Sequence, residues 1–333
     1  MHKKISIKTI LILLLPILVS AQDPHLSQFY AAPLFTNPAL AGASRKIRFA
    51  TSVRNQYTAL NNNYRTAVFG IDGFVPNANS GLGLLATYDI AGDGFLTTTS
   101  FNAAYSYSFD INRKWAISAG LMAGMLQKQF DFSKFIFEDQ LDPVRGVARP
   151  TSEANNPPLE QRIIPNFSTG GIIFSDAFFA GAAIHNLFEP NQSFYYVTAD
   201  SAALRLPRRY TLHAGANIYL TESRYDENRM VLSPNILFMQ QRTFSQINAG
   251  FYLKQKALTV GTWFRQTSAN ADAVIFLLGL RFPAFRVGYT YDLVVSKARS
   301  ATVGSHELSL IVELKTPKRQ GIRNKKVLKC PEF

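Results

Sequence analysis

The chain has 333 residues and a formal net charge of +13 at pH 7. Charged residues make up only 17% of it, below the roughly 25% typical of soluble domains. It contains 26 Phe and 14 Tyr, and its single Cys excludes an internal disulfide. After residue 21, no apolar run approaches the about 18 residues that a membrane-spanning helix needs. These features favour a β-structure that meets lipid.

Residues 1–21 have the features of a secretory leader. Lys3, Lys4 and Lys8 precede a short apolar core, and small residues allow cleavage ahead of Gln22. A core this short, with these flanks, predicts a signal peptide rather than a retained membrane anchor. The protein is therefore expected to leave the cytoplasm, which excludes nucleic acid as a partner.

Long alternating segments carry the strongest structural signal. Between residues 95 and 109, apolar or aromatic side chains alternate with small polar ones, and residues 115–125, 210–220 and 308–314 repeat the pattern. Strands of soluble proteins average about five or six residues, whereas tilted strands of membrane barrels need about 9–11. The sequence therefore predicts an all-β fold, a transmembrane antiparallel β-barrel.

About fourteen such spans can be counted, an even number as in bacterial single-chain barrels. The barrel is predicted over residues 46–315, preceded by a segment at 22–45 and followed by a tail at 316–333. The individual spans are predicted at 46–57, 64–74, 81–91, 95–109, 114–128, 166–175, 178–187, 209–220, 230–239, 244–254, 257–266, 272–281, 285–296 and 305–315.

The connections fall into a mostly short set and a set with two long loops, at about 130–165 and 188–208. Outer-membrane barrels have short periplasmic turns and longer outside loops. Because the strand count is even, both termini are then expected in the periplasm. The loop at 130–165 contains five prolines, and it is either a cap that binds a partner or a variable surface loop.

Residues 22–45 are too apolar for a solvated linker. Pro24, Pro33 and Pro38 interrupt any regular strand or helix there. We predict that this segment packs in the lumen or under its rim and closes the barrel from the periplasmic side. The alternative is a leader that only positions the first strand.

Beyond the last predicted strand, the residues from Lys315 onward carry seven basic side chains against one acidic side chain. This tail is either a solvated periplasmic extension or an electrostatic contact for an acidic partner.

No catalytic, metal or cofactor site is predicted. The histidines of the mature chain are scattered singly, without the spacing of metal ligands. His185 and Asn186 face opposite sides of a strand, and no Ser-His-carboxylate set converges on one face. Residues 88–94 lack the oxygen spacing and terminal Glu of a calcium loop, so a tight turn is the better interpretation. The chain is predicted not to be an enzyme.

Charged residues opposite the apolar faces are expected to point into the lumen. Their mixed signs indicate ion pairs across the interior rather than a pore tuned to one ion. Eight-stranded barrels have no open lumen, and sixteen- to eighteen-stranded ones form channels. A barrel of about fourteen strands is therefore expected to have a lumen that must be filled or gated. The predicted lumen charges are Arg48, Arg54, Lys114, Arg265, Arg286, Asp292, Glu307 and Glu313.

Several motifs, spread from the start of the mature chain to its end, resemble the PorP/SprF family, outer-membrane proteins of the type IX secretion and gliding machinery of Bacteroidetes. The opening pattern SQFYAAPLFTNPALAG is the most specific of these motifs, and Tyr57 departs from the tryptophan usual in the family. The residues that carry the resemblance are Ser27, Gln28, Tyr30, Asn37, Pro38, Ala39, Gly42, Arg54, Gln56, Gly81, Gly83, Asp89, Gly92, Cys330 and Pro331.

The resemblance implies a non-enzymatic barrel that helps to export or retain large surface adhesins, or that belongs to the core of the machinery. Its partners are then outer-membrane lipid, type IX secretion components on the periplasmic side and a secreted surface protein outside. A passive porin or uptake channel is the alternative. A secreted soluble β-sandwich lectin is a third class, which would be extracted without detergent.

Overall fold

The structure is a computed structural model. It describes residues 23–58, 64–92, 94–112, 114–131, 138–142, 146–147, 161–194, 204–221, 230–268, 270–296 and 304–314. The predicted leader at 1–21 and the tail at 316–333, with Cys330 and Pro331, lie outside these residues.

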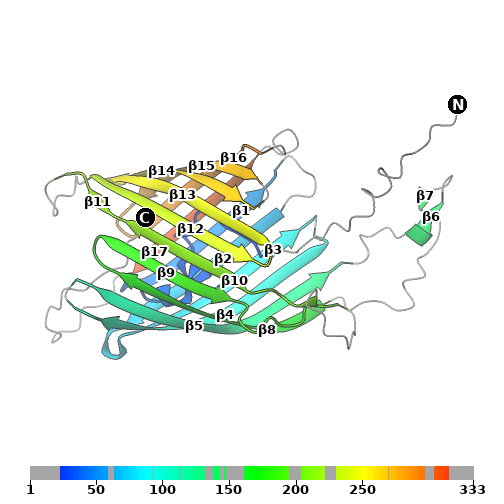
Figure 1. Cartoon of the computed structure of the whole chain (residues 1–333), viewed down its shortest axis with the longest axis horizontal. Coiled ribbons are helices and arrows are strands. Elements are labelled where there is room, and N and C mark those ends of the chain that lie inside the picture. The colour runs from blue at the N-terminus through cyan, green and yellow to red at the C-terminus, as the bar shows by residue number, and fades with distance from the viewer. Residues whose placement is uncertain are drawn as a thin grey trace.

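Antiparallel strands form one closed barrel (Figure 1). Neighbours in the chain pair with one another, and the first strand pairs with the last, which closes the sheet. β10 and β11 are two pieces of one wall segment, so the barrel is 14-stranded, as predicted. Its strands are β1 (Ile47–Gln56), β2 (Tyr64–Val75), β3 (Ser80–Ala91), β4 (Leu96–Asp110), β5 (Ala116–Phe130), β8 (Gln161–Phe174), β9 (Phe178–His185), β10 (Arg209–Ala216), β11 (Ile218–Tyr219), β12 (Met230–Gln241), β13 (Phe244–Gln255), β14 (Leu258–Thr267), β15 (Ala271–Arg281), β16 (Phe285–Val294) and β17 (Ser305–Leu314). A separate small hairpin consists of β6 (Leu141–Asp142) and β7 (Gly146–Val147).

Burial alternates along the strands as the two-residue period predicts. On β4 and β5, Phe101 and Leu121 are 66% and 63% exposed, whereas Ser106 and Ser118 are buried. The outer face is therefore apolar and the inner face carries small polar side chains, the arrangement of a barrel whose wall meets lipid. In the described residues, no helix is long and apolar enough to cross a membrane.

Two proline positions explain where the strands depart from their predicted limits. β8 begins at Gln161 rather than at residue 166, so Pro165 lies within the strand opposite Met125. A proline is tolerated where one strand edge is unpaired, and β9 pairs with β8 only from Thr169 onward. The break between β10 and β11 lies opposite Pro234, which has no backbone N–H to donate to the ladder.

The connections distinguish the two ends of the barrel. One end, here called the turn end, holds the start of β1, the end of β17 and the short links β2–β3, β4–β5, β8–β9, β13–β14 and β15–β16. The opposite end, here called the loop end, holds the links β5–β8 and β9–β10, which are the long connections predicted from the sequence.

Residues 23–46, here called the plug, run through the barrel from the loop end to the turn end. Asp23 N donates to Gln241 Oε1 over 2.9 Å at the loop end of β12. At the turn end, Lys46 Nζ lies 2.6 Å from Glu313 Oε2 on β17. Between them, the plug forms α2 (Pro33–Thr36) and the 3-10 turn η1 (Pro38–Leu40), and the blue ribbon lies within the ring of strands (Figure 1). The predicted packing of this segment in the lumen is confirmed.

The path of the plug places the first and the last described residues, Asp23 and Leu314, at opposite ends of the barrel. The even strand count places the start of β1 and the end of β17 together, and Ile47 does pair with Leu314. The segment ahead of β1 then returns through the lumen, so Asp23 lies at the end opposite to Leu314. Both chain ends lie outside the described residues, so their periplasmic location stays a prediction.

Candidate functional site: a plug inside the barrel

Apolar side chains of the plug form the centre of the molecule. Leu26 and Leu34 pack with Val68, Leu85 and Met122 on one wall. On the opposite wall, Phe29 packs edge-on against Trp263, with ring centroids 4.9 Å apart, and both belong to a buried cluster with Leu237, Tyr252, Ile275 and Leu277. Leu40 joins a third cluster with Ala116, Ile172, Phe174 and Phe179. Burying a large apolar side chain is worth about 1.5–3 kcal/mol, so these contacts hold the plug in place.

A buried ionic cluster fixes the start of the plug. Asp292 Oδ2 accepts from Arg54 Nη2 over 2.8 Å and from Arg265 Nη1 over 2.9 Å. Glu307 Oε2 lies 3.4 Å from Arg54 Nη1, and all four side chains are at most 2% exposed. Two guanidinium groups thus face two carboxylates, which balances the charge within the cluster.

The plug completes this cluster through its backbone. Ser27 N and Gln28 N donate to the Glu307 carboxylate over 2.7 and 3.1 Å, and Ser27 Oγ donates to Asp292 Oδ2 over 2.7 Å. Ser309 Oγ donates to Gln28 Oε1 over 2.6 Å. Because buried charges are stable only with hydrogen-bond partners, Ser27 and Gln28 form part of the barrel's electrostatic core, in which Asp292 Oδ1 and Arg54 Nε have no partner among the described residues.

Three further ion pairs hold the end of the plug at the turn end. Arg48 forms a bidentate pair with Asp72, with distances of 2.8 and 3.0 Å, and it also donates to Leu40 O. Gly42 N donates to Asp72 Oδ2 over 2.8 Å. Glu313 binds both Lys46 and Arg286, each over 2.6 Å.

Glycines of the wall lie in close contact with the middle of the plug. The Asn37 side chain is fully buried and donates to Gly171 O and Ala182 O over 3.1 and 3.2 Å, while its Oδ1 accepts from Ala39 N. A Cβ on Gly170 would overlap Asn37 Oδ1, and one on Gly120 would overlap the Pro38–Ala39 backbone. The absence of side chains there allows the plug to lie directly against the strands.

Replacing Gly170 by alanine is expected to displace Asn37 and to destabilise the protein by about 1–3 kcal/mol, the usual cost of overpacking. Gly171→Ala is the matched control on the same strand, because its nearest neighbour lies 3.8 Å from the added Cβ. The free energy of unfolding, measured with urea in lipid or detergent, checks this difference. Equal stability of the two variants would show that the wall does not select Asn37.

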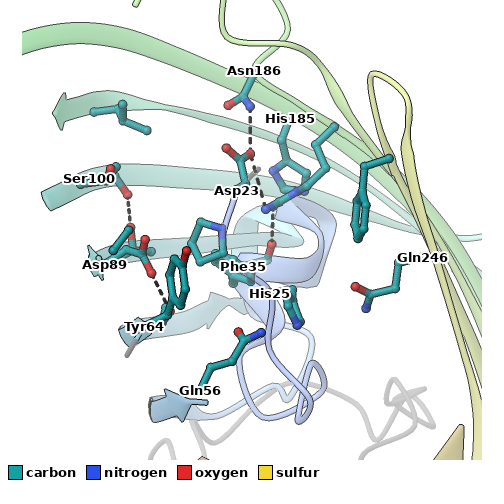
Figure 2. A pocket seen from close by; sticks show the side chains of 18 of the residues that line it. Asp23, His25, Phe35, Gln56, Tyr64, Asp89, Ser100, His185, Asn186 and Gln246 are labelled. Carbon is teal, nitrogen blue, oxygen red and sulfur yellow. Dashed lines mark hydrogen bonds and ion pairs between the residues drawn. The ribbon is translucent and has the colours of Figure 1, made fainter. Parts of the chain in front are cut away.

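Above the plug, the loop end of the lumen encloses a cavity of about 630 Å³, here called the vestibule. Figure 2 shows Asp23, His25 and Phe35 of the plug beneath it, with Asp89, His185 and Gln246 on the surrounding wall. Its polar lining comes mainly from hydroxyl and amide groups, including Thr87, Ser100, Asn102, Asn166 and Gln246. In the described residues, no group of three or more His, Cys, Asp or Glu side chains could hold a metal ion.

The family model of the type IX secretion system membrane protein PorP/SprF matches residues 18–312 of the chain. This chain belongs to the PorP/SprF family. Family and fold together identify an outer-membrane β-barrel of the type IX secretion system. No curated protein matches the sequence.

Several solved outer-membrane barrels resemble this PorP/SprF protein in shape. The Acinetobacter baumannii protein Omp33 is 9% identical with a TM-score of 0.46, covering 82% of this chain and 100% of its own. The Ralstonia pickettii toluene transporter TbuX is 9% identical with a TM-score of 0.48, covering 85% and 93%. The Pseudomonas putida toluene transporter TodX is 8% identical with a TM-score of 0.46, covering 88% and 94%. At these values, the likeness does not bear on what this protein binds or transports.

Most residues of the opening PorP/SprF motif lie at contacts between the plug and the wall. Ser27, Gln28, Asn37, Ala39 and Gly42 make the contacts described above. Pro38 begins η1, and Tyr30 packs edge-on against Phe179 with ring centroids 5.6 Å apart. Arg54 lies in the ionic cluster, whereas Gln56 and Asp89 line the vestibule. Gly92 has a φ of 63° in the β3–β4 turn, a left-handed conformation that favours glycine.

The predicted lumen charges gather at two places in this PorP/SprF barrel, with one exception. Arg54, Arg265, Asp292 and Glu307 form the ionic cluster, and Arg48, Arg286 and Glu313 lie near the turn end. Lys114 instead lies exposed in the β4–β5 turn, before β5 begins at Ala116. Its backbone N donates to Asn112 Oδ1 there, so the expectation that it points into the lumen is wrong.

Sequence reasoning did not select several residues that the site uses. Asp72 pairs with Arg48, and Asp23 binds Arg209 and Asn186. The alternation within residues 64–74 places Asp72 on the inner face, so its position could have been found. Nothing in the sequence indicates that Gly120 and Gly170 face the plug, because their role depends on segments far away in the chain.

Proposed function

We propose that this PorP/SprF protein is a non-enzymatic scaffold that supports the export or surface retention of large adhesin-type cargo. The plug is the observation that carries this proposal. A channel needs an open lumen, whereas here the chain's own segment fills it through buried apolar clusters and ion pairs. A barrel that is filled at one end and hollow at the other suits a fixed outer-membrane platform better than a porin.

The two ends would serve different partners. With the long loops outside, as is usual for outer-membrane barrels, the loop end and its vestibule face the exported cargo. The turn end, where β17 ends, then faces periplasmic components of the secretion machinery. The sequence that follows Leu314 is basic, which would suit an acidic partner.

The test combines a cell-surface readout with a conductance measurement. Removing the gene should abolish surface display of at least one large adhesin, and reintroducing the intact chain should restore it. The purified protein should not conduct ions in planar bilayers, because the plug fills the lumen. A protein that conducts while its removal leaves every surface adhesin in place would instead be the porin of the alternative interpretation.

A further inference from the structure

The vestibule is a chamber with one open side. Its floor is formed by Asp23, Pro24, His25 and Phe35 of the plug, and its walls come from strands around the barrel. The volume of about 630 Å³ lies in the range of ligand pockets, about 300–1,000 Å³. Anything that enters must do so from the loop end and must stop at the plug.

Several buried amide atoms on its walls have no hydrogen-bond partner within the part of the chain that the structure describes, although Asn102 Nδ2 donates to Ser100 Oγ. Gln246 is 1% exposed, and neither its Oε1 nor its Nε2 has a partner in the described chain. The Oδ1 atoms of Asn102 and Asn166 are likewise buried and unpartnered. Figure 2 shows the Gln246 amide directed from the wall towards the side where His25 lies. Since buried polar groups are nearly always hydrogen-bonded, these amides indicate a missing ligand.

Most charged groups of the vestibule have partners, although Arg209 Nε on the wall and His25 Nε2 on the floor are buried without one among the described residues. Asp89 accepts from Thr66 Oγ1 over 2.6 Å, and Lys128 donates to Gln192 Oε1. Arg209 faces Asp23, and Asp272 lies 3.5 Å from Arg265. The groups that remain unpartnered are therefore mostly neutral amides, which can both donate and accept. They fit an uncharged ligand that offers both hydrogen-bond donors and hydrogen-bond acceptors.

The protein itself shows how amide side chains hold a peptide in this lumen. The extended start of the plug is bound at the rim by Gln241 Oε1, which accepts from Asp23 N. Deeper in the lumen, Asn37 donates to Gly171 O and Ala182 O, and Gln28 donates to Glu307 O. In each contact, an Asn or Gln side chain pairs with a peptide group. The unpartnered amides beside the plug are equipped for the same kind of contact.

We propose that the vestibule binds the end of an extended, uncharged polar peptide that belongs to the exported partner. The proposal rests on the scaffold function proposed above and adds a binding site to it. A chain end is required because the floor is closed, so an internal segment would have to fold back on itself to leave. Gln246, Asn102 and Asn166 bind peptide groups of this segment.

The full-length protein, purified in detergent and immobilised, is the reagent for the test. The probes are a pool of synthetic hexapeptides built from Gly, Ser, Thr and Asn, and, in a parallel binding reaction, maltohexaose. Mass spectrometry of the retained material should show a subset of the peptides and no maltohexaose. Gln246→Leu should lower peptide retention about tenfold, as expected for the loss of two hydrogen bonds. Asn166→Trp should abolish it by filling the chamber.

Gln127→Leu is the control, because this amide alternates on β5 with the buried side chains of Leu126 and Lys128 and bonds Gln161 outside the lumen. It should retain peptides like the unchanged protein. Gln246→Leu should also unfold at the same or a higher temperature, since it removes an unpaired buried amide rather than a structural contact.

Three outcomes would overturn the proposal: no peptide retained, retention unchanged in both vestibule variants, or retention of maltohexaose alone. Each of them leaves the scaffold function intact if adhesin display still depends on the gene. Conversely, peptide binding without any effect of the gene on adhesins would refute the scaffold function and leave a peptide site.

Discussion

Replacing Asp292 by alanine is expected to destabilise the folded barrel by about 3–5 kcal/mol, the range found when one partner of a buried ion pair is removed. Asp292 Oδ2 lies within 2.9 Å of guanidinium nitrogens from both Arg54 and Arg265, and it also accepts from Ser27 Oγ. Without this carboxylate, two buried cations face Glu307 as the nearest remaining anion of the cluster. The attachment of the start of the plug is expected to weaken, because Ser27 Oγ loses the carboxylate to which it donates.

Urea unfolding in lipid vesicles, followed by tryptophan fluorescence, measures this effect, since Trp263 lies against Phe29 of the plug. Glu189→Ala is the matched control, because its contact with Arg208 spans 3.8 Å between side chains that are 33% and 43% exposed. Exposed pairs contribute about 0–1 kcal/mol. A similar small loss for both variants would mean that the ionic cluster does not stabilise the barrel.

Deleting residues 24–42 is expected to leave a folded barrel that admits small solutes and no longer supports display of its cargo. The wall strands pair with one another around the whole circumference, including β1 with β17, so the sheet does not need the plug for closure. The deletion exposes Arg48, Asp72 and Glu307 to water in a lumen wider than that of an eight-stranded barrel. Water and small ions can then cross it.

Single-channel recording of the purified variant and surface labelling of the adhesin in cells give the two readouts. A variant with the same residues replaced by a Gly-Ser segment of equal length separates the lost contacts from the shortened chain, and it should behave like the deletion. A deletion variant that folds, remains impermeable and still displays the adhesin would show that this segment neither seals the barrel nor contributes to its function.

The barrel was predictable because its signal is local. Alternation in residues 95–109 predicts both the strand β4 and the outward direction of Phe101, since neighbouring side chains on a strand point to opposite faces. The predicted strand limits failed at residues 161–165, which were assigned to a loop although β8 begins at Gln161 and has an unpaired edge there. Such an edge depends on the length of β9 and cannot be read from Pro165 itself.

The interior was only partly predictable. Alternation places Arg54, Arg265 and Asp292 on the inner face, but strand pairing had to be known before they could be assigned to one cluster. The apolar, proline-broken opening indicated a packed segment. Its direction through the lumen could not follow from an even number of strands, because that number fixes only where β1 starts and β17 ends.

The direction of the plug sets the order of events when the protein is assembled. The chain enters β1 at the turn end, while Asp23 is tied to Gln241, Asn186 and Arg209 at the opposite rim. If the wall closes first, only a free amino end can be drawn through the lumen, so any leader or globular fusion ahead of Asp23 has to be removed beforehand. If the plug folds first, the wall has to wrap around it with that end already on the far side. A bulky group attached to the amino end therefore blocks assembly by the first route and is tolerated by the second.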